Sequence, residues 1–246
     1  MDSLVNKIFK DKIIIITGAS SGLGMEIANY FSKHDAKIIV CARNLKKLKK
    51  NFYYKKNILC KKVDVSNSEE IKKFIKTILK RFKRVDILIN NAGTTKEKFI
   101  DKIENKDIYK IINTNLIAPF LFLKYLIPVM KRNNYGRIVN ISSGGAINCS
   151  SKYSVYSASK AGLNTLAKSV TNEVGAYNIK INTLSPGPIK TKLFPKNKLS
   201  PKLCMPTLEY LCSLSKKGPS GKFFWFMRKI QIIPKININW GLPPKN

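Results

Sequence analysis

Short runs of isoleucine and valine alternate with longer segments of helical spacing, and this alternation limits the possible folds more than any other feature. We expect buried strands at residues 12–17, 37–41, 58–63, 86–89, 137–141 and 179–184. We expect helices at residues 22–33, 45–54, 105–131 and 154–176, and another that Ser66 or Ser68 caps and that ends at residue 82. Right-handed crossovers between parallel strands place helices on both faces of a sheet. The predicted fold class is therefore α/β, with a doubly wound parallel sheet.

The length of 246 residues fits a single domain of this class. Prolines interrupt the pattern after residue 186, and only a helix at 207–215 and a strand at 221–227 are predicted beyond it. The sheet would then have about seven strands, and the domain would extend over residues 1–227. Residues 228–246 contain three prolines, and they are predicted to form an irregular C-terminal tail.

The chain is strongly basic, with a formal net charge of +32. Such a charge can attract a nucleic acid, an anionic membrane surface or an acidic partner protein. Lysines contribute 40 of the positive charges and arginines only 6, and the lysines are spread along the chain. Proteins that recognise base edges favour arginine, whose planar group matches guanine. We therefore favour compositional bias over a functional basic surface, and we predict no specific nucleic-acid partner.

Metal chemistry and histidine catalysis have little support in the sequence. The five cysteines show no Cys-x-x-Cys spacing, and the single histidine, His34, is expected at the surface. No metal site is therefore predicted. The apolar runs are shorter than the ~20 residues of a membrane-spanning helix, and the N-terminal residues are too polar for a signal peptide. These features predict a cytoplasmic protein without a membrane span.

A glycine-rich turn, TGASSGLG at residues 17–24, follows the first strand and opens the first helix. Its glycines permit a tight turn and a close approach of the backbone to a pyrophosphate, and the helix N-terminus attracts the anion. In this context the turn is typical of a dinucleotide-binding Rossmann fold. The predicted cofactor-binding residues of the turn are Gly18, Ser20, Ser21, Gly22, Leu23 and Gly24.

The ends of the second and third strands indicate which dinucleotide is bound. NAD sites usually place an acidic residue after the second strand, but this chain has Arg43 there. A guanidinium suits a 2′-phosphate, so we expect NADP(H) to be preferred to NAD(H); the alternative is that Arg43 is a solvated surface cation. We expect Asp64 and Val65 to contact the adenine, although Asp64 could instead only begin the next helix.

Tyr156 and Lys160 stand four residues apart in the predicted helix 154–176, on one face and about 6 Å apart along the axis. A nearby ammonium favours the phenolate, so we expect Lys160 to lower the pKa of Tyr156 and to make it a better proton shuttle. Tyr153 lacks such a partner, because Ser157 stands four residues after it. Tyr156 is therefore the candidate general acid.

Other polar segments follow the strands at the same edge of the sheet, which is where ligands bind in open α/β folds. The fourth strand is followed by Asn91, Ala92 and Gly93, and the fifth by Ser142 and Ser143. The sixth strand is followed by Pro186, Gly187, Ile189 and Thr191, and Asn115 lies in the long helix.

The chain contains, in this order, TGxxxGxG, NNAG, the asparagine of the long helix, the serine after the fifth strand, YxxxK and PGxxxT. Over residues 10–191 this series of motifs resembles that of the classical short-chain dehydrogenases/reductases. The resemblance implies that Tyr156 donates a proton to a substrate carbonyl. Ser143, thirteen residues before it, would hydrogen-bond the same oxygen and is favoured over Ser142. Lys160 would hold the nicotinamide ribose, and Asn115 would support a water relay to Lys160.

The same resemblance assigns the remaining segments to the cofactor. Residues 91–93 would line its cleft, Pro186 and Gly187 would belong to its wall, and Ile189 and Thr191 would meet the nicotinamide amide. It also implies a homodimer or homotetramer, in which helices 105–131 and 154–176 face their counterparts.

Residues 90–103 and 136–143 look most like the 3-oxoacyl-[acyl-carrier-protein] reductases of this family. The predicted function is therefore NADP(H)-dependent reduction of a ketone, with a 3-oxoacyl thioester, free or linked to an acyl carrier protein, as the favoured substrate. Residues 218–225 lack the Asp-Gly-Gly of that subgroup and look more like carbonyl reductases. A general ketone or aldehyde reductase is thus the alternative, and a non-catalytic dinucleotide-binding regulatory protein is a more remote one.

Overall fold

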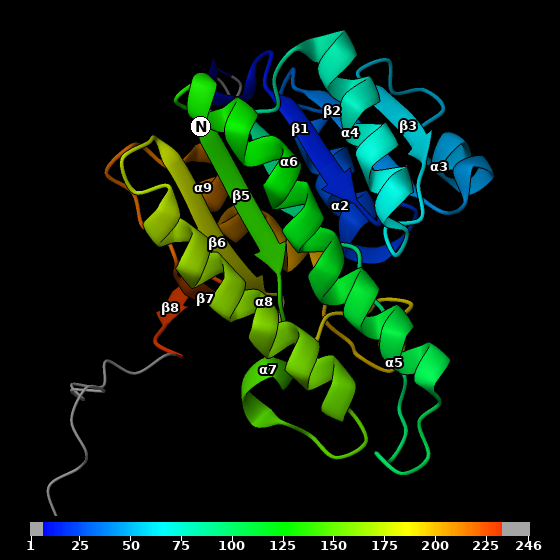
Figure 1. Ribbon diagram of the computed structural model, residues 1–246. Coiled ribbons are helices and arrows are strands. Elements are labelled where there is room, and N and C mark those ends of the chain that lie inside the picture. The colour runs from blue at the N-terminus through cyan, green and yellow to red at the C-terminus, as the bar shows by residue number, and fades with distance from the viewer. Residues whose placement is uncertain (1–6, 233–246) are drawn as a thin grey trace, which may run out of the picture.

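The isoleucine-rich runs form the central strands of a single sheet in the computed structural model, which describes residues 7–232 (Figure 1). The strand order is β3-β2-β1-β4-β5-β6-β7-β8. All neighbours from β3 to β7 are parallel, and β8 is antiparallel to β7. The strands are β1 (Ile13–Thr17), β2 (Lys37–Ala42), β3 (Ile58–Lys62), β4 (Ile87–Asn90), β5 (Gly136–Ile141), β6 (Ile179–Ser185), β7 (Phe223–Trp225) and β8 (Arg228–Ile230). The α/β fold class with a doubly wound sheet is confirmed.

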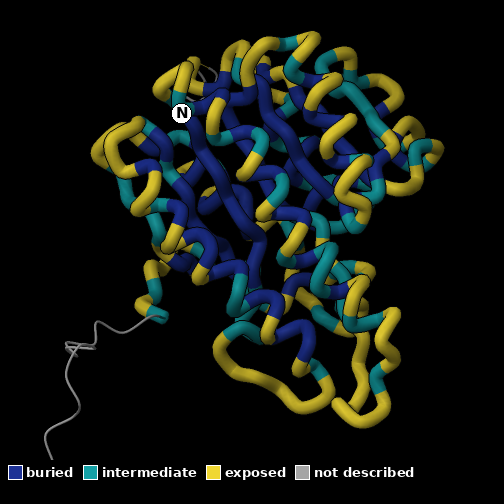
Figure 2. The backbone as a smooth tube through the Cα atoms, in the orientation of Figure 1, coloured by how far each residue is buried: buried dark blue, intermediate teal, exposed yellow. Residues whose placement is uncertain are grey.

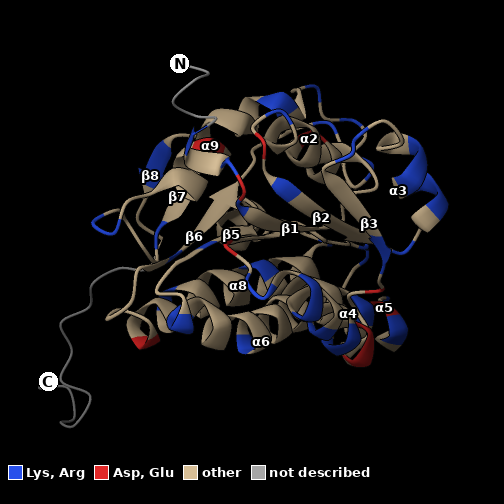
Figure 3. Ribbon diagram, turned by 90° about the horizontal axis from the view of Figure 1, so that it is seen from above, with Lys and Arg blue, Asp and Glu red and all other residues tan. Residues whose placement is uncertain are grey.

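Helices cover both faces of the sheet, as the view along its edge shows (Figure 3). Alternate residues of a strand point to opposite faces, so Ile14 and Ile16 of β1 enter one apolar cluster and Ile13 and Ile15 enter the other. This two-sided burial explains why the central strands are runs of isoleucine (Figure 2). One face carries α2 (Gly22–Phe31), α3 (Leu45–Asn51) and α9 (Met205–Ser213). The other carries α4 (Ser68–Phe82), α6 (Ala118–Arg132) and α8 (Ser154–Glu173).

The C-terminal part departs from the sequence prediction. The irregular tail expected from residue 228 is wrong for its first residues, because β8 pairs with β7 as a hairpin. Its residues Arg228 and Lys229 are exposed, so no alternation of apolar and polar side chains signals the strand. The strand forms because the chain reverses at Phe226, which has φ +47° and brings β8 alongside Trp225. The sheet therefore has eight strands rather than about seven; residues 233–246 lie outside the described residues.

Two local predictions are also wrong. Helix α4 is capped by Asn67, whose side chain accepts the N–H groups of Glu69 and Glu70, and neither serine serves as its cap. His34 is buried rather than at the surface, because the N-terminal segment folds over it. Its ring lies 5.0 Å from that of Tyr30 and 6.3 Å from that of Phe9.

The predicted helix 105–131 is one stretch of 28 residues, Asn105–Arg132, interrupted by a π-helical turn. It comprises α5 (Asn105–Ile112), the π-turn η1 (Asn113–Ile117) and α6. Among the described helices it is the one long and apolar enough to cross a membrane by length and composition alone. Its side chains Phe122, Leu126 and Met130 belong to the apolar cluster beneath the sheet, as expected of a core helix.

Candidate active site

The glycine turn is fastened to the segment that follows β4. Thr17 Oγ1 accepts the N–H groups of Asn91 and Ala92 at 3.0 and 2.9 Å, and Asn91 Nδ2 donates to the Thr17 carbonyl at 2.8 Å. Gly18 has φ +68°, and a Cβ at this position would lie 2.7 Å from the Ala92 Cα atom. Only glycine therefore fits where the two segments cross. The NNAG motif thus holds the turn in place as well as lining the cleft beside it.

The N-terminus of α2 is open to an anion. Its N-cap Ser21 makes no side-chain hydrogen bond to the helix, and the first turn contains no acidic residue. The first N–H groups of a helix have no partners within the helix, and its dipole favours negative charge there. Since Gly22 and Leu23 line the cleft, this end of α2 is suited to a phosphate group.

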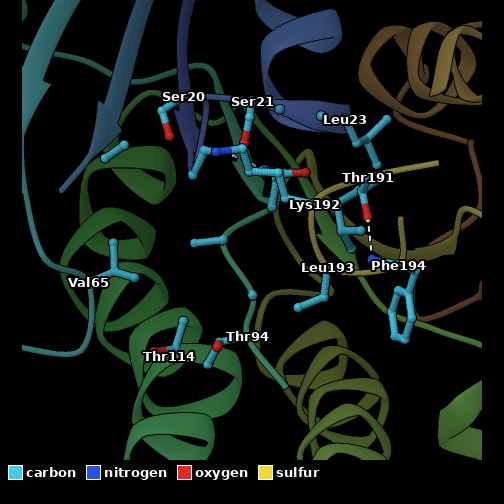
Figure 4. A pocket seen from close by; sticks show the side chains of 18 of the residues that line it. Ser20, Ser21, Leu23, Val65, Thr94, Thr114, Thr191, Lys192, Leu193 and Phe194 are labelled. Carbon is cyan, nitrogen blue, oxygen red and sulfur yellow. Dashed lines mark hydrogen bonds between the residues drawn. The ribbon is translucent and has the colours of Figure 1, made fainter. Parts of the chain in front are cut away.

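A cleft of about 500 Å³ lies at the carboxyl ends of the parallel strands (Figure 4). All the cofactor-binding residues expected from the sequence line it, together with Ser143. These residues are Gly18, Ser20, Ser21, Gly22, Leu23, Gly24, Arg43, Asp64, Val65, Asn91, Ala92, Gly93, Tyr156, Lys160, Pro186, Gly187, Ile189 and Thr191. Of the predicted site residues, Asn115 alone is not among the described residues that line the cleft.

The cleft is strongly cationic. Its described lining contains one carboxylate, Asp64, and five cationic side chains, those of Arg43, Lys47, Lys110, Lys160 and Lys192. Burial raises the pKa of Asp64, but hydrogen bonds from Ser66 and the charge of Arg43 outweigh it, so the pKa lies below its usual value. Asp64 is thus a carboxylate whose Oδ1 is already engaged by the Ser66 N–H and hydroxyl.

Lys160 is buried at the inner end of this cleft. Its Nζ donates to the Ile141 carbonyl at 2.7 Å and lies 5.9 Å from the centre of the Tyr156 ring. Burial of the ammonium lowers the pKa of Lys160 to about 8. The hydrogen bond to Ile141 uses one of the three N–H donors of the ammonium, which leaves donors for a ligand.

Tyr156 lies beside it with only 5% of its surface exposed. Burial raises the pKa of Tyr156 above its ordinary value, and the hydrogen bond with the Ser143 hydroxyl offsets this only in part. The sequence predicted a lowered pKa through Lys160, and this prediction is wrong for the protein without a ligand. The loss of hydration of the phenolate outweighs the stabilising contacts.

The neighbouring candidates are distinguished by their surroundings. The Ser143 Oγ accepts the N–H of Gly145 at 3.0 Å and lies next to Tyr156. The Ser142 hydroxyl is buried and has no hydrogen-bond partner within residues 7–232. The rival Tyr153 donates its hydroxyl to Glu97 at 3.2 Å. Ser143 and Tyr156 are therefore the two candidates whose hydroxyl groups lie next to each other.

Asn115 lies behind the cleft, in the π-turn rather than in regular helix. Its side chain accepts the Thr94 N–H at 2.8 Å and donates to the Thr94 carbonyl and to Ser159 Oγ at 2.9 and 3.0 Å. These bonds use both amide N–H donors and one lone pair of Oδ1. Asn115 thus fixes the segment after β4 to α8.

The donors and spaces of the cleft fit a dinucleotide cofactor. A Cβ at Gly93 would lie 3.6 Å from both Lys160 Nζ and Asn115 Oδ1, so this glycine leaves room directly beside the lysine. The glycine turn and the uncapped α2 N-terminus supply backbone donors for a pyrophosphate, and Arg43 supplies charge at the far end.

A second pocket of about 620 Å³ adjoins the first. The two share Ser143, Tyr156, Gly187 and Phe194 as a common wall. Aromatic and aliphatic side chains line this apolar pocket together with six uncharged serine and asparagine side chains, and no Lys, Arg, Asp or Glu is found among its described lining residues. Its outer wall comes from Ile147 of the short helix α7 (Gly145–Asn148), from Tyr153 at the N-cap of α8, and from Phe223, Trp225 and Ile230 of the β7–β8 hairpin.

Several lining residues escaped the sequence analysis. Lys47 lies in the first turn of α3, close in sequence to Arg43, and its charge could have revealed it. Lys192 follows directly on Thr191, the last residue of the PGxxxT motif. Trp225 and Ile230 carry no local signal, because their place in the pocket depends on how the last strands pack.

Comparisons with known proteins agree with this geometry. The sequence model of a family described as short chain dehydrogenase matches residues 12–201. A 3-oxoacyl-[acyl-carrier-protein] reductase of Rickettsia typhi is 36% identical over 189 residues, covering 76% of this chain and 77% of its own. An uncharacterized oxidoreductase of Staphylococcus saprophyticus is 33% identical over 194 residues, covering 75% and 76%. A metagenomic short-chain oxidoreductase solved in complex with NADP has a TM-score of 0.80 at 25% identity, covering 89% of this chain and 97% of its own.

Proposed function

The chain belongs to the short-chain dehydrogenase family and is an oxidoreductase, and on this premise we propose that it reduces a ketone with NADPH. One observation carries the proposal. Tyr156, supported by Ser143, stands where a cationic cleft meets a pocket without charged lining side chains among the described residues, and Lys160 lies buried beside it. A polar cofactor and an apolar substrate can thus meet at a single proton donor.

Tyr156, Ser143 and Lys160 are the side chains proposed to take part in proton transfer. A phenol carries its proton at neutral pH, and burial raises the pKa of Tyr156 further, so Tyr156 holds a proton that it can donate to a carbonyl oxygen gaining negative charge. The Ser143 hydroxyl would hydrogen-bond the same oxygen. Lys160 would bind the ribose hydroxyls through its free N–H donors and stabilise the phenolate left after proton transfer. The nicotinamide, when bound, supplies the hydride.

The charge of the cleft supports NADP(H) over NAD(H). Arg43 stands after β2, where an NAD site would have a carboxylate, and Lys47 lines the cleft four residues later. Asp64, the acidic residue of the described lining, already binds Ser66. The structural neighbour solved with NADP agrees with this choice.

The favoured substrate is a 3-oxoacyl thioester, as in the bacterial relatives named for that reaction. The second pocket offers an uncharged, partly aromatic space for an acyl chain next to Tyr156. A general ketone or aldehyde reductase is the alternative, because the matched segments of the curated relatives cover only about three quarters of this chain and the β7–β8 wall lies beyond the family match at residue 201.

We also infer a cytoplasmic homodimer or homotetramer. The helical stretch of α5, η1 and α6 exposes large apolar side chains, namely Tyr109, Ile117 and Phe120. Such a surface suits contact between subunits. Light scattering during size-exclusion chromatography should give at least twice the chain mass of 27.9 kDa at micromolar concentration; a monomer would contradict the inference.

The enzymatic proposal is tested by following NADPH, and separately NADH, by absorbance. A short 3-oxoacyl thioester and an unrelated ketone would serve as substrates. Rapid NADPH-dependent turnover of the thioester is the expected result. Turnover of the ketone alone would favour the general reductase, while tight NADPH binding without turnover of either would favour the non-catalytic regulatory alternative.

A further inference from the structure

The short segment Thr191–Phe194 lines both hollows of the active site, which are the cationic cleft and the second pocket beside it. Thr191 and Lys192 lie in the cationic cleft, whereas Phe194 lines both the cleft and the apolar pocket (Figure 4). The segment is closed by a hydrogen bond from the Phe194 N–H to Thr191 Oγ1 at 3.1 Å. Because the turn is so short and is closed by this bond, a displacement of one end also moves the other end.

Phe194 reaches the catalytic tyrosine. Its ring centre lies 6.0 Å from that of Tyr156, with an interplanar angle of 73°, and 6.3 Å from that of Tyr153. Both distances lie in the range at which aromatic rings attract one another, and the contact with Tyr156 is edge-to-face. The position of Phe194 therefore shapes the entrance to the pocket beside the proton donor.

Lys192, at the other side of the turn, faces Lys47 across the cleft. The two lysines come from segments that follow β6 and β2, which are separated in the sheet by β1, β4 and β5. Close contact with the Lys192 ammonium lowers the pKa of Lys47. None of the ion pairs between described side chains includes either lysine.

Two ammonium groups that face each other without a carboxylate repel, and an anion between them would turn this repulsion into attraction. The anion must reach the end of the cleft at which Arg43 stands, because Lys47 lies in the first turn of α3, which begins two residues after Arg43. Among the phosphates of a dinucleotide, the one on the adenosine ribose is expected there.

We propose that Lys47 and Lys192 hold the 2′-phosphate of NADP(H) between them, and that this contact fixes the Thr191–Phe194 turn with Phe194 against Tyr156. The proposal rests on the NADP(H)-dependent function inferred above. In this arrangement the 2′-phosphate both distinguishes NADP(H) from NAD(H) and sets the shape of the substrate pocket. A cofactor without it would leave the turn free to move.

Binding of cofactor fragments tests the phosphate contact without catalysis. Calorimetry would compare 2′,5′-ADP with 5′-AMP, which differs from it only by lacking the 2′-phosphate, on the wild type and on Lys192→Gln and Lys47→Gln. We expect each variant to bind 2′,5′-ADP about tenfold more weakly and 5′-AMP within about twofold of the wild type. Lys196→Gln is the matched control, since Lys196 is exposed on the same loop but does not line the cleft.

Hydrogen exchange tests the second half of the proposal. Saturating 2′,5′-ADP should slow amide exchange in peptides covering residues 190–199 of the wild type, and 5′-AMP at saturation should not. In Lys192→Gln, saturated with 2′,5′-ADP, this protection should be lost. Equal protection in the variant would overturn the coupling between the phosphate and the turn.

The outcomes separate this inference from the proposed function. A wild type that binds 2′,5′-ADP no better than 5′-AMP would contradict NADP(H) dependence itself. A wild-type preference that survives in both lysine variants would overturn only the two-lysine contact. Equal loss of both ligands in Lys192→Gln would place this lysine at the 5′-phosphate and would equally overturn the assignment.

Discussion

The two hollows that meet at Tyr156 differ in charge and in how the chain builds them. The cofactor cleft is formed mainly by segments that directly follow the strands β1 to β6, and its described lining contains five cationic side chains. The apolar pocket takes its outer wall from α7, from the turn at Phe194 and from the β7–β8 hairpin, with no charged side chain in its described lining. In a chain of net charge +32, such a pocket favours an uncharged ligand.

The comparison assigns a different role to each hollow. The cleft offers many donors for phosphates and ribose, whereas the pocket offers shape and apolar surface. Changes at the shared wall should abolish chemistry, changes in the cleft should alter cofactor choice, and changes in the pocket should alter substrate affinity alone.

The largest effect is expected at the shared wall. Tyr156→Phe removes the proton donor but keeps the ring, so kcat should fall by about a hundredfold to ten-thousandfold. The dissociation constant of NADPH should stay within about twofold, because the phenol lies at the far end of the cleft from Arg43. Steady-state kinetics and a fluorescence titration measure the two quantities. Retained turnover would show that another group supplies the proton.

Lys160→Met should change the pH dependence of stability by about 3 kcal/mol. Its folded pKa of about 8 lies below the usual 10.5, and this lowering corresponds to that free energy. Below about pH 8 the wild type carries the full cost of a buried ammonium. Between about pH 8 and 10.5 the unfolded chain binds more protons at this position, so the wild type gains stability as the pH rises.

Urea unfolding of the cofactor-free wild type and variant at several pH values measures this change. The difference between their unfolding free energies should shift in favour of the wild type as the pH rises. Taking the difference cancels the titration of the other lysines. A difference that is constant with pH would mean that Lys160 is not desolvated.

Arg43→Gln should change cofactor preference with a smaller effect. Loss of one charge-assisted contact should weaken NADPH binding by about tenfold or more, while NADH binding should change by less than about threefold. Titrations with both cofactors provide the measurement. Lys46→Gln, three residues later and outside the described cleft lining, controls for the general loss of positive charge. Equal weakening of both cofactors would contradict a 2′-phosphate contact.

The smallest effect is expected in the pocket. Trp225 is 43% exposed, so Trp225→Ala should raise KM for an apolar ketone by only about threefold to tenfold and leave NADPH binding unchanged. Tyr54→Ala is the control, because Tyr54 is 89% exposed and outside the described lining of both hollows. If KM does not change, the substrate does not reach the β7–β8 wall.

The cleft could be predicted from the sequence because each of its parts follows directly on a strand. The strand before Gly18 and the helix after it are recognisable from their spacing, and parallel pairing brings the strand ends together. Lys192 could not be assigned in this way. Its position depends on how the segment after β6 bends across the cleft to meet Lys47.

The pocket could not be predicted, because its wall depends on contacts between distant segments. The eighth strand contains the charged residues Arg228 and Lys229 and therefore lacks the apolar pattern of a strand. Helix α7 is too short to show helical spacing. Burial was likewise invisible in the sequence: it reverses the expected direction of the pKa of Tyr156 and covers His34.

Transfer of deuterium tests the central claim most directly. NADPH labelled with deuterium at C4 of the nicotinamide, in separate samples on each face, would be incubated with a 3-oxoacyl thioester and with an unrelated ketone. We predict that one labelled form delivers deuterium to the carbinol carbon of the alcohol product, and that Tyr156→Phe lowers the rate without changing which face reacts. Tight cofactor binding with no deuterium in either product, from either face, would contradict the account.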